Sequence, residues 1–379
     1  MLAALILNSL LAREPTDGWL PKWQSYILAE SKTRYCDTET GEELGWLVSP
    51  FLSGFAYGYL ATNETEWLDR LVDWADAWLK RAVKEPDGFV GWPKQGTGGL
   101  VEDQLFTDSL LGEAMALTPL VRLHGQVHRG GLSWRSEIDR KLDRYLQASE
   151  ACFRKWDGRG CWREVKDGGV WVVPAFGIDK ASGGWTAGYA TRRNDGFSNP
   201  ANKENAIAEW LLAMFDATGK PVYRDRAAAW FRVMKARIRT NGRYLVWNYW
   251  DPAGPWDFKP DGSTRHWVGV HPNGGYYGID VGAIVDAFEH GVVFDRGDID
   301  KLIATNRDFM WNQKLPGAEF RRIDGGEPDP RWPKTPGVLW VPLGKYDAKL
   351  REIFEATFQP ASWGGLSTTP WNVWRSRTG

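Results

Sequence analysis

The chain has 379 residues, of which 43% are apolar and 25% are charged, which is ordinary usage for a globular protein with a large core. Its 47 basic and 48 acidic residues give a formal net charge of −1, which argues against binding of nucleic acid through a basic surface. No apolar run reaches the roughly 18 residues that a membrane-spanning helix needs. We therefore expect neither a nucleic-acid partner nor a membrane partner.

The three cysteines, Cys36, Cys152 and Cys161, fit neither a disulfide framework nor zinc-finger spacing. We expect free thiols, although Cys152 and Cys161 could form a local disulfide in an oxidising compartment. Residues 1–14 are apolar but lack the basic start and the cleavage site of a signal peptide, so we expect them to form a first helix.

Helical periodicity dominates the rest of the chain, because apolar residues recur three and four positions apart. Asn63 and Ser133 are expected as N-caps, Gly219 as a helix end and Pro221 as a first-turn residue. Strand-like runs are short and lie at 170–173 and 244–247. In chain order, helices are expected at 50–62, 64–84, 101–125, 134–156, 201–218, 220–240, 279–293, 298–313 and 343–358.

The connections between these helices alternate in length. In a set of antiparallel helix hairpins, alternate connections lie at opposite ends, so all the long ones would emerge on one face, where long loops usually serve function. We therefore predict an all-α fold, a single (α/α) toroid domain over residues 1–379. An open superhelix of helix pairs is the alternative, although such solenoids keep their connections short. Short connections lie near 63, 126–133, 219 and 294–297, and long ones near 86–100, 157–200, 241–278 and 314–342.

The composition is unusual in its 24 tryptophans and 42 glycines. Tryptophans within predicted helices are expected in the core. Those in the long loops either wall a groove in which sugar rings stack, or anchor the loops to the body of the protein. The loop tryptophans are Trp92, Trp162, Trp171, Trp185, Trp247, Trp250, Trp256, Trp267, Trp332 and Trp340.

Two segments that end long loops, FSNPANKEN and RHWVGVHPNGGYYG, carry the candidate catalytic residues. Asparagines at a helix start either cap the helix or help to bind an anion. A loop histidine beside tyrosines suits general acid–base catalysis, or it anchors the loop by hydrogen bonds. A metal site at these histidines lacks a third ligand. The residues concerned are Asn199, Asn202, Lys203 and Asn205 in the first segment, and Arg265, His266, His271, Asn273, Tyr276 and Tyr277 in the second.

Two further segments are candidates for substrate binding. Trp247, Trp250 and Asp251 in VWNYWDPAGPWDF resemble the wall of a sugar subsite. Glu102 and Gln104 in GGLVEDQLFTD either complement a helix dipole or contact substrate. Motifs for nucleotide binding and for serine hydrolysis are absent from the sequence.

Two reactions on a polysaccharide compete. A glycoside hydrolase needs two carboxyl groups flanking the bond, and the candidates are Glu102, Asp103, Asp108, Glu204 and Asp251. A lyase abstracts the proton beside a uronic-acid carboxylate, which must first be neutralised by an amide or a cation, and then uses histidine or tyrosine as base and acid. The two catalytic segments supply that second set of groups.

On these two segments the chain resembles the α/α-barrel polysaccharide lyases that act on polyuronates such as alginate and glucuronan. The resemblance implies β-elimination on an anionic polysaccharide, with asparagine neutralising the carboxylate, and it departs from the family in having no adjacent Asn-His pair. We also expect no cofactor and no metal, and a secreted or periplasmic location, with a cytoplasmic one as the alternative. Which asparagine and which histidine act stays open, as does the oligomeric state.

Several alternatives remain beside the lyase. A hydrolase or epimerase in the same fold would also suit the sequence, as would a toroid that binds glycans without catalysis. Tyr249 and Tyr346 are alternative acids. Arg192, Arg193, Lys203 and Arg265 lie near the two segments and could attract an anionic chain.

Overall fold

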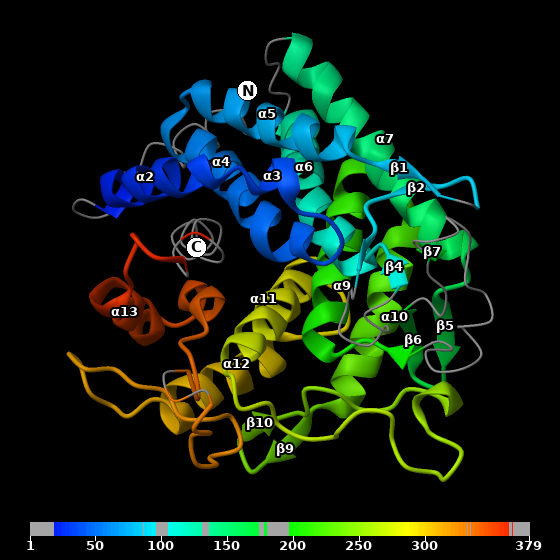
Figure 1. Cartoon of the computed structure of the whole chain (residues 1–379). Coiled ribbons are helices and arrows are strands. Elements are labelled where there is room, and N and C mark those ends of the chain that lie inside the picture. Colours follow the sequence, from blue (N-terminus) through cyan, green and yellow to red (C-terminus); the bar gives the residue numbers. More distant parts are fainter. Residues whose placement is uncertain are drawn as a thin grey trace.

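The computed structural model describes residues 19–85, 87–95, 105–130, 136–173, 178–179, 197–331, 333, 335–363 and 366. Most of this part of the chain is helical, and the helices follow one another around a ring (Figure 1). The expected first helix at residues 1–14 lies outside the described residues. The main helices are α2 (Trp19–Glu30), α3 (Tyr35–Thr38), α4 (Ser49–Thr62), α5 (Glu66–Lys80), α6 (Leu110–Gly130), α7 (Ser136–Gly158), α9 (Ala201–Thr218), α10 (Pro221–Arg237), α11 (Gly275–Glu289), α12 (Arg296–Ala304) and α13 (Ala348–Thr357).

Five short helical segments complete the helical part of the described chain. Two of them are π-helical and continue directly into or out of α-helices. They are the 3₁₀-helices η1 (Ser31–Thr33), η3 (Pro255–Asp257) and η5 (Val341–Lys345), and the π-helices η2 (Leu44–Val48) and η4 (Thr305–Met310).

Consecutive helices pair across short connections, α4 with α5, α6 with α7, α9 with α10 and α11 with α12. The first member of each pair is an inner helix, and α6 and α11 pack on opposite flanks of α9, while α4 packs on α6. Arg122 of α6 links three inner helices, because its guanidinium pairs with Glu209 of α9 and with Asp286 of α11. The predicted (α/α) toroid is therefore confirmed.

Buried apolar side chains form one cluster that runs through the described chain from Trp19 to Leu366. The last described residues pack against the first inner helix. The Trp363 ring lies 6.0 Å from that of Phe51 on α4, and Leu366 is fully buried beside Gly54 of the same helix. The C-terminal segment thus closes the ring against α4.

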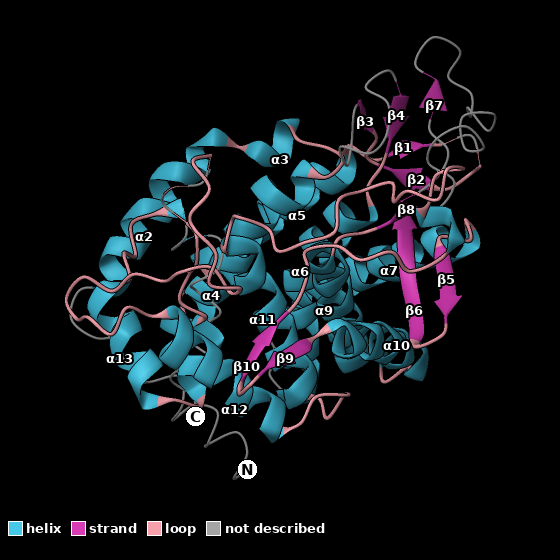
Figure 2. Ribbon diagram, turned by 90° about the horizontal axis from the view of Figure 1, so that it is seen from below, coloured by secondary structure: helices cyan, strands magenta, loops and turns pink. Residues whose placement is uncertain are grey.

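The strands are short, antiparallel and confined to the long connections. Figure 2 shows β1, β2, β3, β4 and β7 gathered at one edge of the helical body. They pair as β1-β2, β3-β4-β7, β5-β6-β8 and β9-β10. The strands are β1 (Val83–Lys84), β2 (Val90–Gly91), β3 (Lys94–Gln95), β4 (Leu105–Thr107), β5 (Trp162–Val165), β6 (Gly168–Val173), β7 (Ile178–Asp179), β8 (Phe197–Ser198), β9 (Arg239–Asn241) and β10 (Tyr244–Val246).

Some expected helix boundaries differ from the structure. The helix predicted to start at 101 begins at Leu110, because residues 105–107 pair as β4 and the Ser109 hydroxyl accepts a hydrogen bond from the Gly112 amide as an N-cap. Asn63 is left-handed, with φ of 60°, and ends α4 rather than capping α5. Ser133 lies outside the described residues. The helix end at Gly219 and the first-turn Pro221 are confirmed.

The three cysteines are free, as predicted, and all three are buried. In the described part of the chain, no helix is both long and apolar enough to cross a membrane.

The described parts of the long connections meet at the N-terminal ends of the inner helices, as the toroid prediction requires. A Cβ atom on Gly112, in the first turn of α6, would collide with the Gly41 carbonyl oxygen. A Cβ atom on Gly274, which precedes α11, would collide with the Gly337 Cα atom. Only glycine allows these crossings, which hold the 41–48 and 335–338 segments over the helix ends.

Candidate active site

An aromatic cluster of five residues, Tyr249, His266, Trp267, His271 and Tyr276, lies at this end of the toroid. The His271 ring centre is 4.7 Å from that of Tyr249 and 4.6 Å from that of Tyr276. Trp267 stacks at 6.0 Å on Tyr249 and lies 5.7 Å from His266. Four of the rings are half-buried, whereas Trp267 is 45% exposed. The cluster thus brings an aromatic surface and two imidazoles close together.

The backbone around α11 determines where these rings lie. The Tyr249 carbonyl accepts a hydrogen bond from the amide of Ala201, the first residue of α9, and the Tyr249 amide donates to the Gly269 carbonyl. The Asn273 side chain accepts a hydrogen bond from the amide of Gly275, the first residue of α11, and this helix carries Tyr276. Two inner helices therefore position the cluster.

The hydrogen bonds assign opposite tautomers to the two histidines. His266 Nδ1 lies 3.0 Å from the Trp267 carbonyl oxygen, so Nδ1 carries the proton and Nε2 holds the basic lone pair. His271 Nδ1 accepts from the Asn273 amide at 2.9 Å, so in the neutral ring Nε2 carries the proton. Burial, reinforced by the charge of Arg331, lowers the pKa of His271 to about 4. His266 is thus arranged as a proton acceptor and His271 as a hydrogen-bond donor.

Glu42 brings a carboxylate to the cluster. It pairs with Lys203 at 2.9 Å and accepts a hydrogen bond from Trp46 Nε1 at 3.0 Å. Burial and the charge of Glu42 raise the pKa values of Tyr249 and Tyr276, so both hydroxyls keep their protons and can donate them. Neither Glu42 nor Trp46 was singled out from the sequence, because both lie in an unremarked stretch before α4.

Of the predicted site residues, His266, His271 and Tyr276 come together here, and Lys203 pairs with Glu42, whose charge acts on Tyr249 and Tyr276. Tyr277 does not join them: it is buried, and its hydroxyl accepts a hydrogen bond from the His271 amide at 2.8 Å. The alternative acid Tyr249 is central to the cluster, whereas Tyr346 donates to Glu289 at the far end of α11.

Arg265 is held beside the cluster by its backbone, because its amide donates to the Asp257 carbonyl at 2.8 Å. Its guanidinium Nη1 is buried and has no hydrogen-bond partner among the described residues.

The three predicted asparagines are buried in the first turns of α9 or just before it. Asn199 donates to Glu204 and to the Trp171 carbonyl. Both polar atoms of the Asn205 amide are paired, one with Asp280 and the other with the Trp230 ring. The Asn202 amide is buried without a hydrogen-bond partner in the described part of the chain.

The predicted tryptophan wall is not supported for Trp247 and Trp250, which are both buried. Trp247 Nε1 donates to Asp280 at 2.8 Å, and Trp250 Nε1 donates to the Ser198 carbonyl at 2.9 Å. Trp92, Trp171 and Trp340 are also buried, so the anchoring alternative holds for these five loop tryptophans. A sugar cannot stack on rings that the core already covers.

The carboxylates named for a hydrolase are scattered. Asp108 is buried with Lys155 and Arg159, whose positive charges outweigh burial and lower its pKa. Glu204 is buried, and burial raises its pKa to about 8. Asp251 accepts from Asn248 and lines a cavity of about 440 Å³ that Arg237 and Arg239 also line.

The remaining predicted residues cannot be placed. Glu102, Asp103, Gln104, Trp185, Arg192, Arg193 and Trp332 lie outside the described residues.

No protein-family model matches the chain, and no curated protein matches it in sequence. Among solved structures, it is similar to an inactive α-1,6-mannanase variant of Salegentibacter sp. HEL1_6 in complex with α-1,6-mannotetrose, with 13% identity and a TM-score of 0.47 over 94% of this chain and 98% of that one. A second inactive variant of that enzyme, in complex with α-1,6-mannotriose, gives 12% identity and a TM-score of 0.46 with the same coverage. A D-mannose isomerase gives 15% identity and a TM-score of 0.42 over 92% of this chain and 84% of that one.

At these identities and TM-scores, the similarities do not decide the reaction. They give no support to the expected resemblance to polyuronate lyases.

Proposed function

We propose that the protein is a carbohydrate-active enzyme that carries out acid–base chemistry on a sugar bound at the aromatic cluster. The observation that carries this proposal is the opposite tautomers of His266 and His271 within one aromatic cluster. One imidazole can accept a proton while the other donates a hydrogen bond, and this combination serves a reaction that moves a proton.

The half-exposed Trp267 supports a sugar as the substrate. An indole face stacks on the apolar face of a sugar ring, and the neighbouring hydroxyls and imidazoles can bind the ring's oxygens. Lys203 is already paired with Glu42, so its charge is partly neutralised. We therefore propose a neutral sugar rather than a polyuronate.

The reaction that best fits these groups is proton transfer at a sugar carbon, as in isomerisation or epimerisation. His266 Nε2 would take the proton from the carbon beside the carbonyl group, and the electron pair would move onto the carbonyl oxygen. His271 Nε2–H would stabilise that oxyanion, and Tyr276 or Tyr249 would return a proton to the neighbouring carbon. The proton taken up by His266 would then pass to the tyrosinate through solvent, which restores both groups, and the reaction requires no oxidant.

Glycoside hydrolysis is the second candidate, and Glu42 favours it. A hydrolase needs two carboxyl groups about 5 to 9.5 Å apart. The charge of Glu42 acts on the tyrosines of the cluster, but Asp108, Glu204 and Asp251 are each engaged elsewhere. Among the described residues, no second carboxylate joins Glu42 near the cluster, whereas two imidazoles are already placed together. The site therefore fits proton transfer better than hydrolysis.

One screen separates these reactions. The protein would be incubated in D₂O with neutral monosaccharides, gluco- and manno-oligosaccharides and polyuronates, and the products followed by proton NMR and near-ultraviolet absorbance. We expect deuterium incorporation at carbon and conversion to an isomer. New reducing ends without deuterium at carbon would support hydrolysis, and an ultraviolet-absorbing product would restore the lyase. Binding with none of these products would contradict an enzyme for these substrates.

Two variants provide the control. His266→Gln should lose turnover but keep sugar binding, because glutamine cannot act as the base. Trp267→Ala should mainly weaken sugar binding, because it removes the stacking surface without touching the proton acceptor. Isothermal titration with the sugar identified in the screen measures both, and equal loss of binding in the two variants would argue against a catalytic role for His266.

A further inference from the structure

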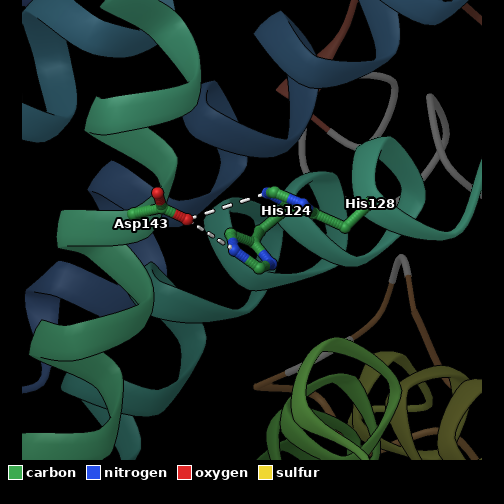
Figure 3. Close-up of side chains that lie close together, drawn as sticks. All are labelled: His124, His128 and Asp143. Atoms are coloured by element: carbon green, nitrogen blue, oxygen red, sulfur yellow. Dashed lines mark hydrogen bonds and ion pairs between the residues drawn. The ribbon is translucent and has the colours of Figure 1, made fainter. Parts of the chain in front are cut away.

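A second cluster of ionisable side chains lies away from the aromatic cluster, between α6 and α7 (Figure 3). His124 and His128 are four residues apart on α6 and therefore lie on one face of that helix. Asp143 faces them from α7. Its Oδ1 atom lies 3.1 Å from His124 Nε2 and 3.7 Å from His128 Nε2. We call these three residues the His–Asp cluster.

We propose that the His–Asp cluster binds a divalent transition-metal ion, with zinc as the reference metal. The three ligand atoms lie within 4.8 Å of one another. In a tetrahedral zinc site, with bonds of about 2.1 Å, neighbouring ligand atoms are about 3.4 Å apart. The two distances to Asp143 bracket that value, so small side-chain rotations would place all three atoms around one ion.

A simple hydrogen bond between His124 and Asp143 explains less of the geometry. It leaves unexplained the His128 ring, whose centre lies 4.1 Å from that of His124 and whose Nε2 atom lies 3.7 Å from the same carboxylate oxygen. That distance is too long for a hydrogen bond. Two imidazoles and a carboxylate that converge on one point are the arrangement by which proteins bind zinc.

Asp139, one turn before Asp143 on α7, supplies a second and independent observation. Nδ1 of His124 and Oδ1 of Asp139 are both buried without a hydrogen-bond partner in the described part of the chain. The Asp139 charge acts on His124, so the two groups are near each other. A histidine that binds a metal through one nitrogen usually donates its other N–H to a carboxylate. A small rotation that joins Asp139 Oδ1 to His124 Nδ1–H when the metal binds would make Asp139 the positioning residue for His124.

Three protein ligands leave a fourth position for water or a small anion. The ligand set contains two nitrogen atoms and one oxygen atom, which suits zinc, cobalt or nickel better than calcium or magnesium.

The His–Asp cluster lies at the opposite end of the toroid from the aromatic cluster. It belongs to the C-terminal half of the inner helix α6 and the N-terminal half of the outer helix α7. Gly125, beside His124, packs against Ala217 near the C-terminal end of α9. A metal ion here would cross-link an inner helix to an outer one, where the short connections run, and would not touch the proposed sugar site.

The test uses the full chain, stripped with a chelator and titrated with ZnCl₂ by calorimetry, and then with CoCl₂ by visible absorption. We expect one ion per chain at micromolar affinity or tighter, with a cobalt spectrum typical of a tetrahedral site. His128→Gln and Asp143→Asn should each weaken zinc binding at least tenfold. Both residues are about half exposed, so the substitutions should leave the fold intact.

His266→Gln is the matched control, because it removes a partly exposed histidine at the other end and should leave zinc binding unchanged. Asp139→Asn should weaken zinc binding 10- to 100-fold without altering the number of ions bound. The proposal is overturned if zinc binds no tighter than millimolar, or if His128→Gln and Asp143→Asn bind zinc like the unaltered protein. Loss of binding in His266→Gln alone would place the metal at the aromatic cluster instead.

Discussion

At the N-terminal ends of the inner helices the aromatic cluster stands on long connections, whereas at the opposite end the His–Asp cluster stands on two regular helices. Tyr249, His266 and His271 come from one irregular segment, whose position depends on backbone contacts with α9 and on the start of α11. His124 and His128 need only the pitch of α6. Long connections can thus bring together side chains that are distant in sequence. Regular helices instead hold a few side chains in fixed positions.

We expect the two ends to serve different functions, with catalysis at the aromatic cluster and metal binding at the His–Asp cluster. His266→Gln should lower kcat by about 10²- to 10⁴-fold, the usual contribution of a general base, with little change in thermal stability. His128→Gln should leave kcat unchanged, because its side chain belongs to the other end. Steady-state kinetics on the substrate found in the NMR screen, with circular dichroism to check folding, would decide this. Equal losses of kcat in both variants would break the proposed separation.

The same irregular segment contains tryptophans of opposite kinds. Trp250 is fully buried against Phe197 and donates to a backbone carbonyl, so Trp250→Ala should cost about 3–5 kcal/mol of unfolding free energy. Trp267 is half exposed, so Trp267→Ala should change that free energy by less than about 0.5 kcal/mol. Urea denaturation of the two variants measures the contrast. A large loss in Trp267→Ala would mean that its ring supports the fold rather than a sugar.

These tryptophans also show what could be read from the sequence. The apolar stripe and the glycine stop predicted helix α9 to the residue, because both are local signals. The alternation of short and long connections predicted the toroid, because connectivity limits how hairpins can pack. Burial of Trp247 and Trp250 could not be predicted, because it depends on where a long loop folds back onto the body.

The His–Asp cluster illustrates the opposite failure. Its histidines have the four-residue spacing of a helical ligand pair, a signal that the sequence contains in RLHGQVH. The third residue, Asp143, is far along the chain and meets them only because α6 and α7 fold as a hairpin. Sequence spacing alone does not reveal Asp143 as a ligand, because its contact with the histidines depends on how the two helices pack. Glu42 had no such signal, since Lys203, with which it pairs, and Tyr276, on which its charge acts, lie far along the chain on α9 and α11.

The loop-bearing end also buries a carboxyl group whose state should depend on pH. Glu204 accepts two hydrogen bonds on Oε1, and its Oε2 atom has no partner among the described residues. Burial raises its pKa in the folded state from 4.5 to about 8. The folded protein therefore holds this proton more tightly than the unfolded chain, and the associated stability, present below pH 4.5, is lost as the pH rises through 8.

Glu204→Gln mimics the protonated acid and should remove this dependence. The variant should match the unaltered protein at pH 5 and exceed it at pH 9 by a few kcal/mol, because a tenfold difference in proton affinity between the folded and unfolded chain corresponds to about 1.4 kcal/mol. Urea midpoints measured from pH 5 to 9 would test it. A variant that is less stable at every pH would show that the Glu204 carboxylate is charged in the folded protein.

The smallest expected effect is at the short-turn end. If the His–Asp cluster binds zinc only in the folded protein, then zinc at 100 times its Kd should stabilise the chain by about 2.7 kcal/mol, which corresponds to a rise of a few degrees in Tm. His128→Gln, with zinc affinity reduced at least tenfold, should show at most about half of that rise at the same zinc concentration, and His266→Gln should show the full rise. Because the metal would join α6 to α7, hydrogen exchange should slow mainly in those two helices. Slower exchange around α11 instead would place the ion at the aromatic cluster and contradict two separate sites.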